Sequence, residues 1–269
     1  MIHNANMETH KYKMQVQWPH WSNGYGEFIR GYIFADQTFG QAYDVIPVID
    51  PKISISKIFE WANSDLYTED RNTPQLQYLR DTVPLPVLFD DIQNHKGDIK
   101  IIISYDPVWE NLEKYQYLLT PILEYKLQAI QKAKQIIDNK YRVLHIRTGI
   151  EVDVTADSRL NVTRESFIIK AKEILASYSD MPMVVMCDDI SLIPSLGNVL
   201  SSNTNPKHSR STDMTTDDLV DFCTDLYLIQ NASEVLCLCN FPWYSSGFSF
   251  IPSVINNIPY RQVIIDTVN

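Results

Sequence analysis

The chain has 269 residues, of which 45% are hydrophobic and 21% charged, and its net charge at pH 7 is -10. This balance is ordinary for a globular protein, and the length allows one large domain or two of moderate size. The acidic charge argues against sequence-independent nucleic-acid binding, because that affinity comes mostly from neutralising phosphates. The acidic net charge still allows a local basic pocket for one small anion.

No targeting segment is recognisable in the sequence. The N-terminal stretch "MIHNANMETHKYKM" is polar, and no apolar run approaches the ~20 residues needed to span a bilayer. The cysteines lack a matching set of metal ligands at a suitable spacing, so we expect buried, reduced thiols. These cysteines are Cys187, Cys223, Cys237 and Cys239. Together these features predict a cytoplasmic protein without a transmembrane segment.

In the first half, apolar residues recur at helical spacing and then give way to short buried strands. Helices are predicted at 28–44 and 117–139, and strands at 44–50 and 98–106. Pro47 indicates that its strand ends there or lies at the edge of a sheet. Prolines interrupt residues 51–97, where we expect loops and short helices.

The second half alternates strands and helices more regularly. Strands are predicted at 141–147, 181–189, 233–239 and 260–266, and helices at 163–179, 190–200, 213–232 and 245–257. This alternation is typical of α/β proteins with parallel sheets covered on both faces. We place one α/β unit at 1–138 and a second at 139–269, whose last residues are able to pack back on the first unit.

Parallel sheets bind ligands at the carboxyl ends of their strands. His145 and Arg147 lie at one such end, and Asp188 and Asp189 lie at another. The turn "SSGFS" at 245–249 follows a third strand. Three polar clusters at the same edge of one sheet predict a single site.

Four motifs resemble segments of the fucosyltransferase superfamily, which includes α-1,2-, α-1,6- and protein O-fucosyltransferases. "HIRTG" at 145–149 resembles its His-x-Arg-x-Gly segment, and "SNGYGE" at 22–27 resembles its glycine-rich opening turn before a helix. "MVVMCDD" at 183–189 resembles a strand that ends in Ser/Thr-Asp-Asp, and "SSGFS" resembles a Ser-x-Phe-Ser/Thr helix start. The motifs follow one another in the order of that family, whereas residues 51–115 have no counterpart.

The resemblance implies a GT-B architecture of two facing Rossmann-like domains with mostly parallel sheets. The first domain would hold the acceptor and the second the nucleotide sugar. The implied reaction is an inverting transfer that needs no metal or other cofactor, most simply of L-fucose from GDP-fucose to a glycan hydroxyl. Its partners would be the nucleotide-sugar donor and an oligosaccharide or glycan-bearing acceptor.

Arg147 is the leading candidate for stabilising the departing diphosphate, because a guanidinium forms bidentate hydrogen bonds to phosphate oxygens and stays charged at any working pH. Backbone N–H groups at the start of the 245–257 helix would assist it. Gly24 and Gly26 would let the backbone approach the donor, and a carboxylate such as Asp188 would accept hydrogen bonds from a base or ribose. The predicted donor-binding residues are Gly24, Gly26, His145, Arg147, Gly149, Asp188, Asp189, Ser246, Phe248 and Ser249.

An inverting transfer is helped by a carboxylate that takes the proton from the acceptor hydroxyl. Glu27 is the first candidate for this base, and Glu151 and Asp153 are its competitors. An equal alternative is that Glu27 only caps its helix or pairs with Arg30.

Two other functions remain compatible with the sequence. Thr148 stands where many relatives have a second arginine, so the donor could be another UDP- or GDP-linked pentose or hexose. The scaffold could also serve as a non-catalytic module that binds carbohydrate or nucleotide.

Overall fold

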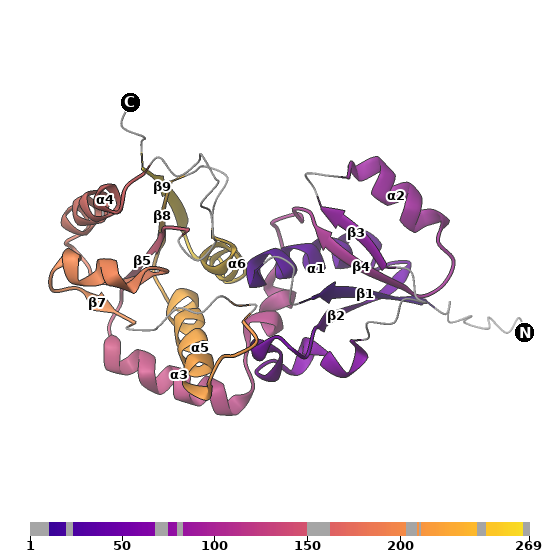
Figure 1. Ribbon diagram of the computed structural model, residues 1–269, viewed down its shortest axis with the longest axis horizontal. Coiled ribbons are helices and arrows are strands. Elements are labelled where there is room, and N and C mark those ends of the chain that lie inside the picture. Colours follow the sequence, from indigo (N-terminus) through magenta and orange to yellow (C-terminus); the bar gives the residue numbers. More distant parts are fainter. Residues whose placement is uncertain are drawn as a thin grey trace, which may run out of the picture.

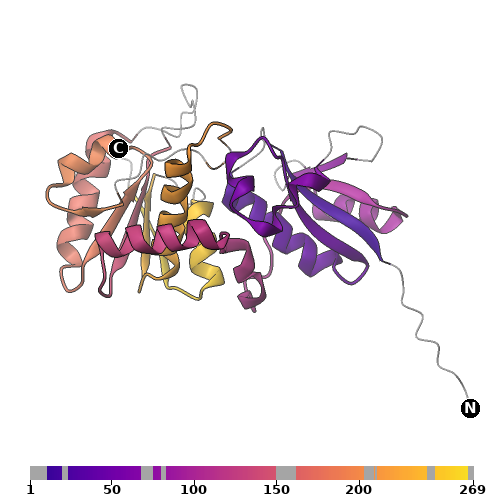
Figure 2. The same cartoon turned by 90° about the horizontal axis from the view of Figure 1, so that it is seen from below.

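The structure, a computed structural model, has two parallel sheets, one in each half of the chain (Figure 1). It describes residues 11–19, 24–67, 75–79, 83–149, 162–202, 209, 211–240 and 246–265. Helices lie between and around the sheets, and both sheets direct the carboxyl ends of their strands toward the same side of the molecule (Figure 2).

The first sheet has the strand order β2-β1-β4-β3, and all its neighbours pair in parallel. Its strands are β1 (Tyr12–Trp18), β2 (Tyr43–Ile49), β3 (Gln75–Leu79) and β4 (Ile99–Ser104). Pro47 lies in the edge strand β2, where a missing N–H costs no ladder hydrogen bond on the open side. The sequence analysis missed β1, whose apolar residues Met14, Val16 and Trp18 alternate with polar ones.

The second sheet has the order β7-β6-β5-β8-β9 and is also parallel throughout. Its strands are β5 (Arg142–Arg147), β6 (Met183–Cys187), β7 (Leu200–Ser201), β8 (Val235–Cys239) and β9 (Tyr260–Ile264). The central strands β5 and β8 are buried along almost their whole length, as expected for strands covered on both faces.

Within the described ranges, six α-helices cover these sheets. They are α1 (Tyr25–Phe39), α2 (Leu85–Asn94), α3 (Leu123–Ile136), α4 (Arg164–Ser177), α5 (Thr216–Gln230) and α6 (Gly247–Ile255). The predicted helix at 117–139 is interrupted: residues Glu113–Leu119 form the 3₁₀ helix η4, and α3 begins after Pro121. Helix α3 packs along α5 of the second half (Figures 1 and 2), and the division at residue 138 stays a prediction.

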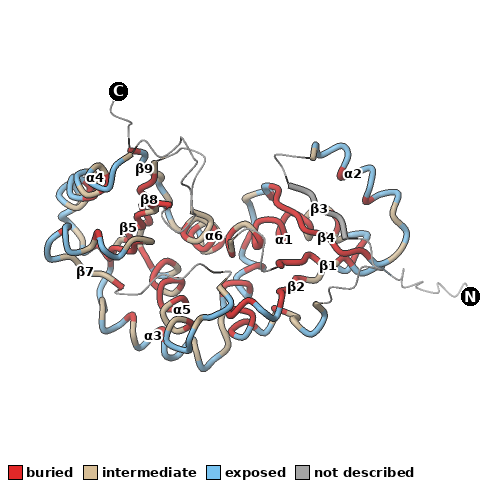
Figure 3. The backbone as a smooth tube through the Cα atoms, in the orientation of Figure 1, coloured by how far each residue is buried: buried red, intermediate tan, exposed pale blue. Residues whose placement is uncertain are grey.

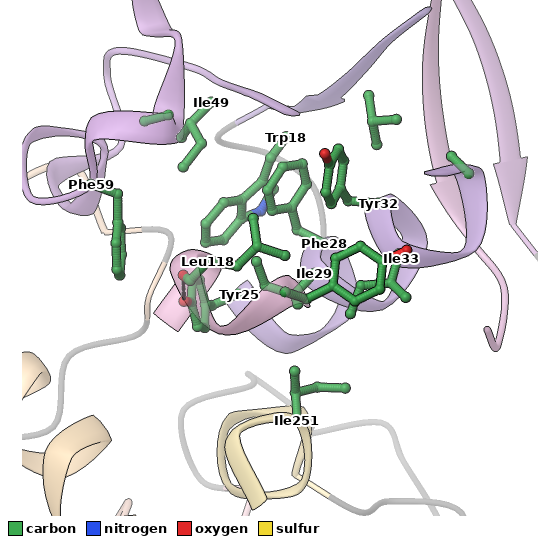
Figure 4. Close-up of a cluster of buried hydrophobic side chains, with 14 of the residues drawn as sticks. Trp18, Tyr25, Phe28, Ile29, Tyr32, Ile33, Ile49, Phe59, Leu118 and Ile251 are labelled. Carbon is green, nitrogen blue, oxygen red and sulfur yellow. Dashed lines mark hydrogen bonds between the residues drawn. The ribbon is translucent and has the colours of Figure 1, made fainter. Parts of the chain in front are cut away.

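One hydrophobic core continues across the junction of the two halves. Trp18 and Phe28 stack with ring centroids 5.2 Å apart, and the same cluster contains Phe222 of α5 and Ile251 of α6. Figure 3 shows buried backbone on both sides of this junction, and Figure 4 shows Ile251 facing α1. The two units are therefore joined by packed side chains that hold α6 against α1.

The described residues contain no helix that is long and apolar enough to cross a membrane. All four cysteines are buried and free of disulfides. Burial raises the pKa of the Cys187 and Cys223 thiols to about 12, which keeps them protonated at physiological pH, in agreement with the prediction of buried, reduced thiols.

Candidate functional site

Two helix N-termini meet where the halves join. A Cβ atom added to Gly26 in the first turn of α1 would lie 2.3 Å from the carbonyl carbon of Gly247, the first residue of α6. The sequence analysis assigned Gly26 to a turn that lets backbone approach a donor. In the structure it lies inside the helix, and its missing side chain lets α6 cross α1 in backbone contact. Gly24 directly precedes α1 as its N-cap residue.

The end of β5 lies against the start of α6, although the two are about a hundred residues apart in the chain. Nδ1 of His145 and Oγ of Ser249 are 2.8 Å apart, and the His145 ring meets the Phe248 ring edge to face at 6.1 Å. Ser246 is the N-cap residue of α6, and its carbonyl accepts from the N–H of Ser249. The structure thus brings together four residues that the motifs predicted to form one site.

His145 is neutral at physiological pH. Its pKa is lowered from an ordinary 6.5 to about 4, mainly by burial; Asp188 opposes this shift, and the nearby Arg147 contributes to it. Arg147 is two residues further along β5 and therefore on the same face of the strand. At the carboxyl end of this strand the positive charge comes from Arg147, since Arg142 lies at the start of β5 and pairs with Asp180 and Glu234.

Asp188 holds the turn that follows β5. Its Oδ2 accepts from Arg147 Nη1 at 2.8 Å and from the Gly149 N–H at 2.9 Å. Its Oδ1 accepts from both the N–H and the hydroxyl of Thr148, each at 2.8 Å. A carboxylate has about four acceptor positions, and the protein itself fills four. Asp188 therefore fixes Arg147 and the turn, and its predicted contact with a base or ribose stays a prediction.

Gly149 completes this turn with φ +78, a left-handed conformation that glycine adopts without strain. Asp189 is the N-cap residue of the 3₁₀ helix η5 (Ile190–Leu196), where its Oδ1 accepts from the N–H of Ser191. Its Oδ2 pairs with Arg164 Nη2 at 3.0 Å. Both aspartates are engaged within the protein.

Glu27 lies in the first turn of α1, next to the crossing with α6. Its Oε2 accepts from the Ser104 hydroxyl at 2.9 Å, and its Oε1 lies 3.3 Å from Arg30 Nη1. The predicted pairing with Arg30 is present, yet 32% of the Glu27 side chain remains exposed. Arg30 also reaches Asp106, with Nε and Oδ1 3.4 Å apart. Glu151 and Asp153, the competing candidates, lie outside the described residues.

The sequence analysis missed Ser104 and Asp106 as members of the site. Both lie at the end of the predicted strand at 98–106, so the rule that selected Asp188 by its place at a strand end would also have selected them. It also missed Ser209, whose hydroxyl accepts from the Tyr25 N–H at 2.9 Å and so caps α1 from the other half. No sequence signal links these two residues. Among the described residues, no group of three His, Cys, Asp or Glu side chains could hold a metal ion.

Two α/β units with parallel sheets, facing each other across helices α1 and α6, define a GT-B-like protein. Solved fucosyltransferase structures share this fold. The chain aligns with NodZ alpha-1,6-fucosyltransferase soaked with GDP-fucose over 91% of its own length and 93% of the other, with a TM-score of 0.55 and 11% identity. A second fucosyltransferase NodZ, from Bradyrhizobium, aligns over 96% and 97% with a TM-score of 0.53 and 11% identity.

POFUT1 in complex with GDP aligns over 96% of this chain and 99% of that chain, with a TM-score of 0.50 and 11% identity. No family model and no curated protein sequence matches the chain. The resemblance to the fucosyltransferase superfamily and the predicted GT-B-like α/β fold are thus confirmed at the level of the fold.

Proposed function

We propose that the chain is a glycosyltransferase that transfers L-fucose from GDP-fucose to a glycan hydroxyl, with inversion and without a metal. The observation that carries this proposal is the junction of β5 and α6, where His145 bonds Ser249 at 2.8 Å and Arg147 emerges from the same strand face. The fold supports it, because similar structures include one soaked with GDP-fucose and one with GDP bound.

The leaving group gives this junction its chemical task. As the bond between the sugar and the diphosphate breaks, negative charge builds on the β-phosphate, and donors already aimed at that oxygen lower the barrier. Arg147 supplies a guanidinium, and the first turn of α6 supplies backbone N–H groups. Asp188 accepts a hydrogen bond from Nη1 of Arg147 and so fixes the guanidinium. Arg147 therefore needs little reorganisation when the charge develops on the phosphate.

Glu27 is proposed as the base on the other side of the junction. The acceptor oxygen forms a bond to the anomeric carbon while its proton passes to the Glu27 carboxylate. The bond from that carbon to the phosphate oxygen breaks, and GDP leaves with the electron pair. Attack opposite to the leaving group inverts the anomeric centre. The exposed 32% of the Glu27 side chain leaves room for an acceptor hydroxyl.

The test is a transfer and donor-hydrolysis assay with GDP-fucose, together with thermal shifts for GDP and UDP. We expect GDP, and not UDP, to raise the melting temperature. Arg147→Ala should lower kcat by at least about a hundredfold, because removing one donor to a developing oxyanion costs ~3 kcal/mol. Arg261→Ala, which removes an exposed arginine of β9, is the matched control and should retain activity.

The panel also separates the alternatives. A shift with UDP alone would reject the guanine assignment and favour another nucleotide-sugar donor, for which the presence of Thr148 in place of a second arginine leaves room. Stabilisation by GDP without transfer or hydrolysis would reject the enzyme and leave a binding module.

A further inference from the structure

We propose that Arg30 is a positioning residue for Glu27 and that Asp106 moderates the electrostatic effect of Arg30 on the Glu27 carboxylate. The inference rests on the proposed function, in which Glu27 takes the proton of the acceptor. Arg30 is 5% exposed within α1, and its neighbours Ile29 and Ile33 belong to the hydrophobic core. A buried guanidinium is costly unless paired, and apolar residues at such places are often at least as stabilising. Packing alone therefore does not account for an arginine here.

The contacts of Glu27 give Arg30 its role. The carboxylate is held at both ends, because Arg30 Nη1 lies 3.3 Å from Oε1 and the Ser104 hydroxyl donates to Oε2 at 2.9 Å. Two anchors on opposite oxygens restrict the side chain to one orientation. A carboxylate has about four acceptor positions, so Glu27 retains capacity for an acceptor hydroxyl at its exposed side.

Asp106 divides the charge of Arg30. Its Oδ1 lies 3.4 Å from Arg30 Nε, whereas Glu27 pairs with Nη1, and half of the Asp106 side chain is exposed. A guanidinium beside a carboxylate favours the ionised form of that carboxylate, and a second carboxylate nearby opposes this effect. The guanidinium of Arg30 therefore holds Glu27 in place while its charge is shared with Asp106.

The groups that contact this turn come from several elements. Strand β4 contributes the Ser104 hydroxyl, and α6 contributes the uncharged Gly247. Arg147 belongs to β5, which contacts α6 through His145. Arg30 pairs with both Glu27 and Asp106, and the charges of Arg30 and Asp106 act on Glu27 with opposite signs.

The opposite signs make the inference testable. In the pH profile of kcat/KM, Arg30→Gln should move the acid limb up by about one pH unit, since an opposite charge within ~4 to 6 Å has at least that effect. Asp106→Asn should move it down by about half as much. Arg30→Lys keeps the charge and should restore the position of the limb. Lys114→Gln removes the ion pair between Lys114 of η4 and Asp36 of α1, the helix that carries Arg30. It should leave the acid limb unmoved.

A ¹³C-detected titration of the Glu27 carboxyl in the same variants gives the same shifts without turnover. This separates the two proposals, because a chain that shows no transfer but the expected titration shifts overturns only the proposed function. Shifts of the same sign in Arg30→Gln and Asp106→Asn, or none, overturn the inference even if transfer occurs. If Arg30→Gln fails to fold, the downward shift in Asp106→Asn decides, since its side chain is half exposed.

Discussion

Each half of the molecule places a carboxylate beside the carboxyl end of a strand, and the two are held in different ways. Asp188, after β6, is 4% exposed and accepts four hydrogen bonds from its own chain. Glu27, beside the end of β4, has contacts to Arg30 and Ser104 and is 32% exposed.

The difference separates a group that builds a site from one able to react in it. A carboxylate with every acceptor position filled cannot take a proton from a substrate without breaking contacts that shape the site. A carboxylate with two anchors and an open side is oriented and still available. Counting acceptor positions therefore assigns different roles to residues that look alike in sequence.

Removing Asp188 is expected to have the largest effect on stability and on GDP binding. Asp188→Ala leaves Arg147 and the N–H groups of Thr148 and Gly149 without their acceptor. Breaking a buried ion pair in this way costs about 3 to 5 kcal/mol. Urea unfolding should show that loss in the free energy of unfolding, and GDP should no longer raise the melting temperature. A fully stable variant with normal GDP binding would show that the turn is held by other contacts.

Glu27→Gln should give the opposite pattern of effects. The amide keeps the size of the side chain, so stability and GDP binding should stay close to those of the unaltered protein. The loss of a general base lowers kcat by about 10²- to 10⁴-fold. Single-turnover transfer measures this directly, and a variant with unchanged kcat would move the base assignment away from Glu27.

His145 makes the stability of the folded chain depend on pH. Its pKa of about 4 in the folded chain lies below the ordinary value of 6.5, so the folded state binds fewer protons between these values. Stability is complete above about pH 6.5 and falls as the pH drops toward 4, by on the order of 2 to 3 kcal/mol at pH 4.5. His145→Gln removes this titration, so urea unfolding at pH 7 and 4.5 should show a smaller loss in the variant. Equal losses of stability in the variant and the unaltered protein would contradict a role for His145 in this pH dependence.

The sequence was informative where a strong local pattern coincided with a place at a strand end. The apolar run of β5 and the glycine that opens α6 located His145, Arg147 and Ser249 on the correct elements. Strand β1 was missed because only three apolar residues, Met14, Val16 and Trp18, carry its alternating pattern.

The role of each site residue depends on partners that are distant in the chain. Asp188 acts on residues 39 to 41 positions away, and Ser104 is 77 positions from Glu27. Gly26 was predicted to bind the donor, and its close approach to Gly247 becomes visible only in three dimensions. Spacing in the sequence identifies candidates, whereas burial and the number of filled hydrogen bonds decide what they do.

The aromatic packing at the junction also bears on how this architecture can be altered. Tyr25 of α1 packs its ring against Phe59 at 5.6 Å and against Phe222 of α5 at 5.6 Å. A chimaera that grafted the second half onto an unrelated first half would set Phe222 and Ile251 against a foreign surface. The halves are consequently poor interchangeable modules.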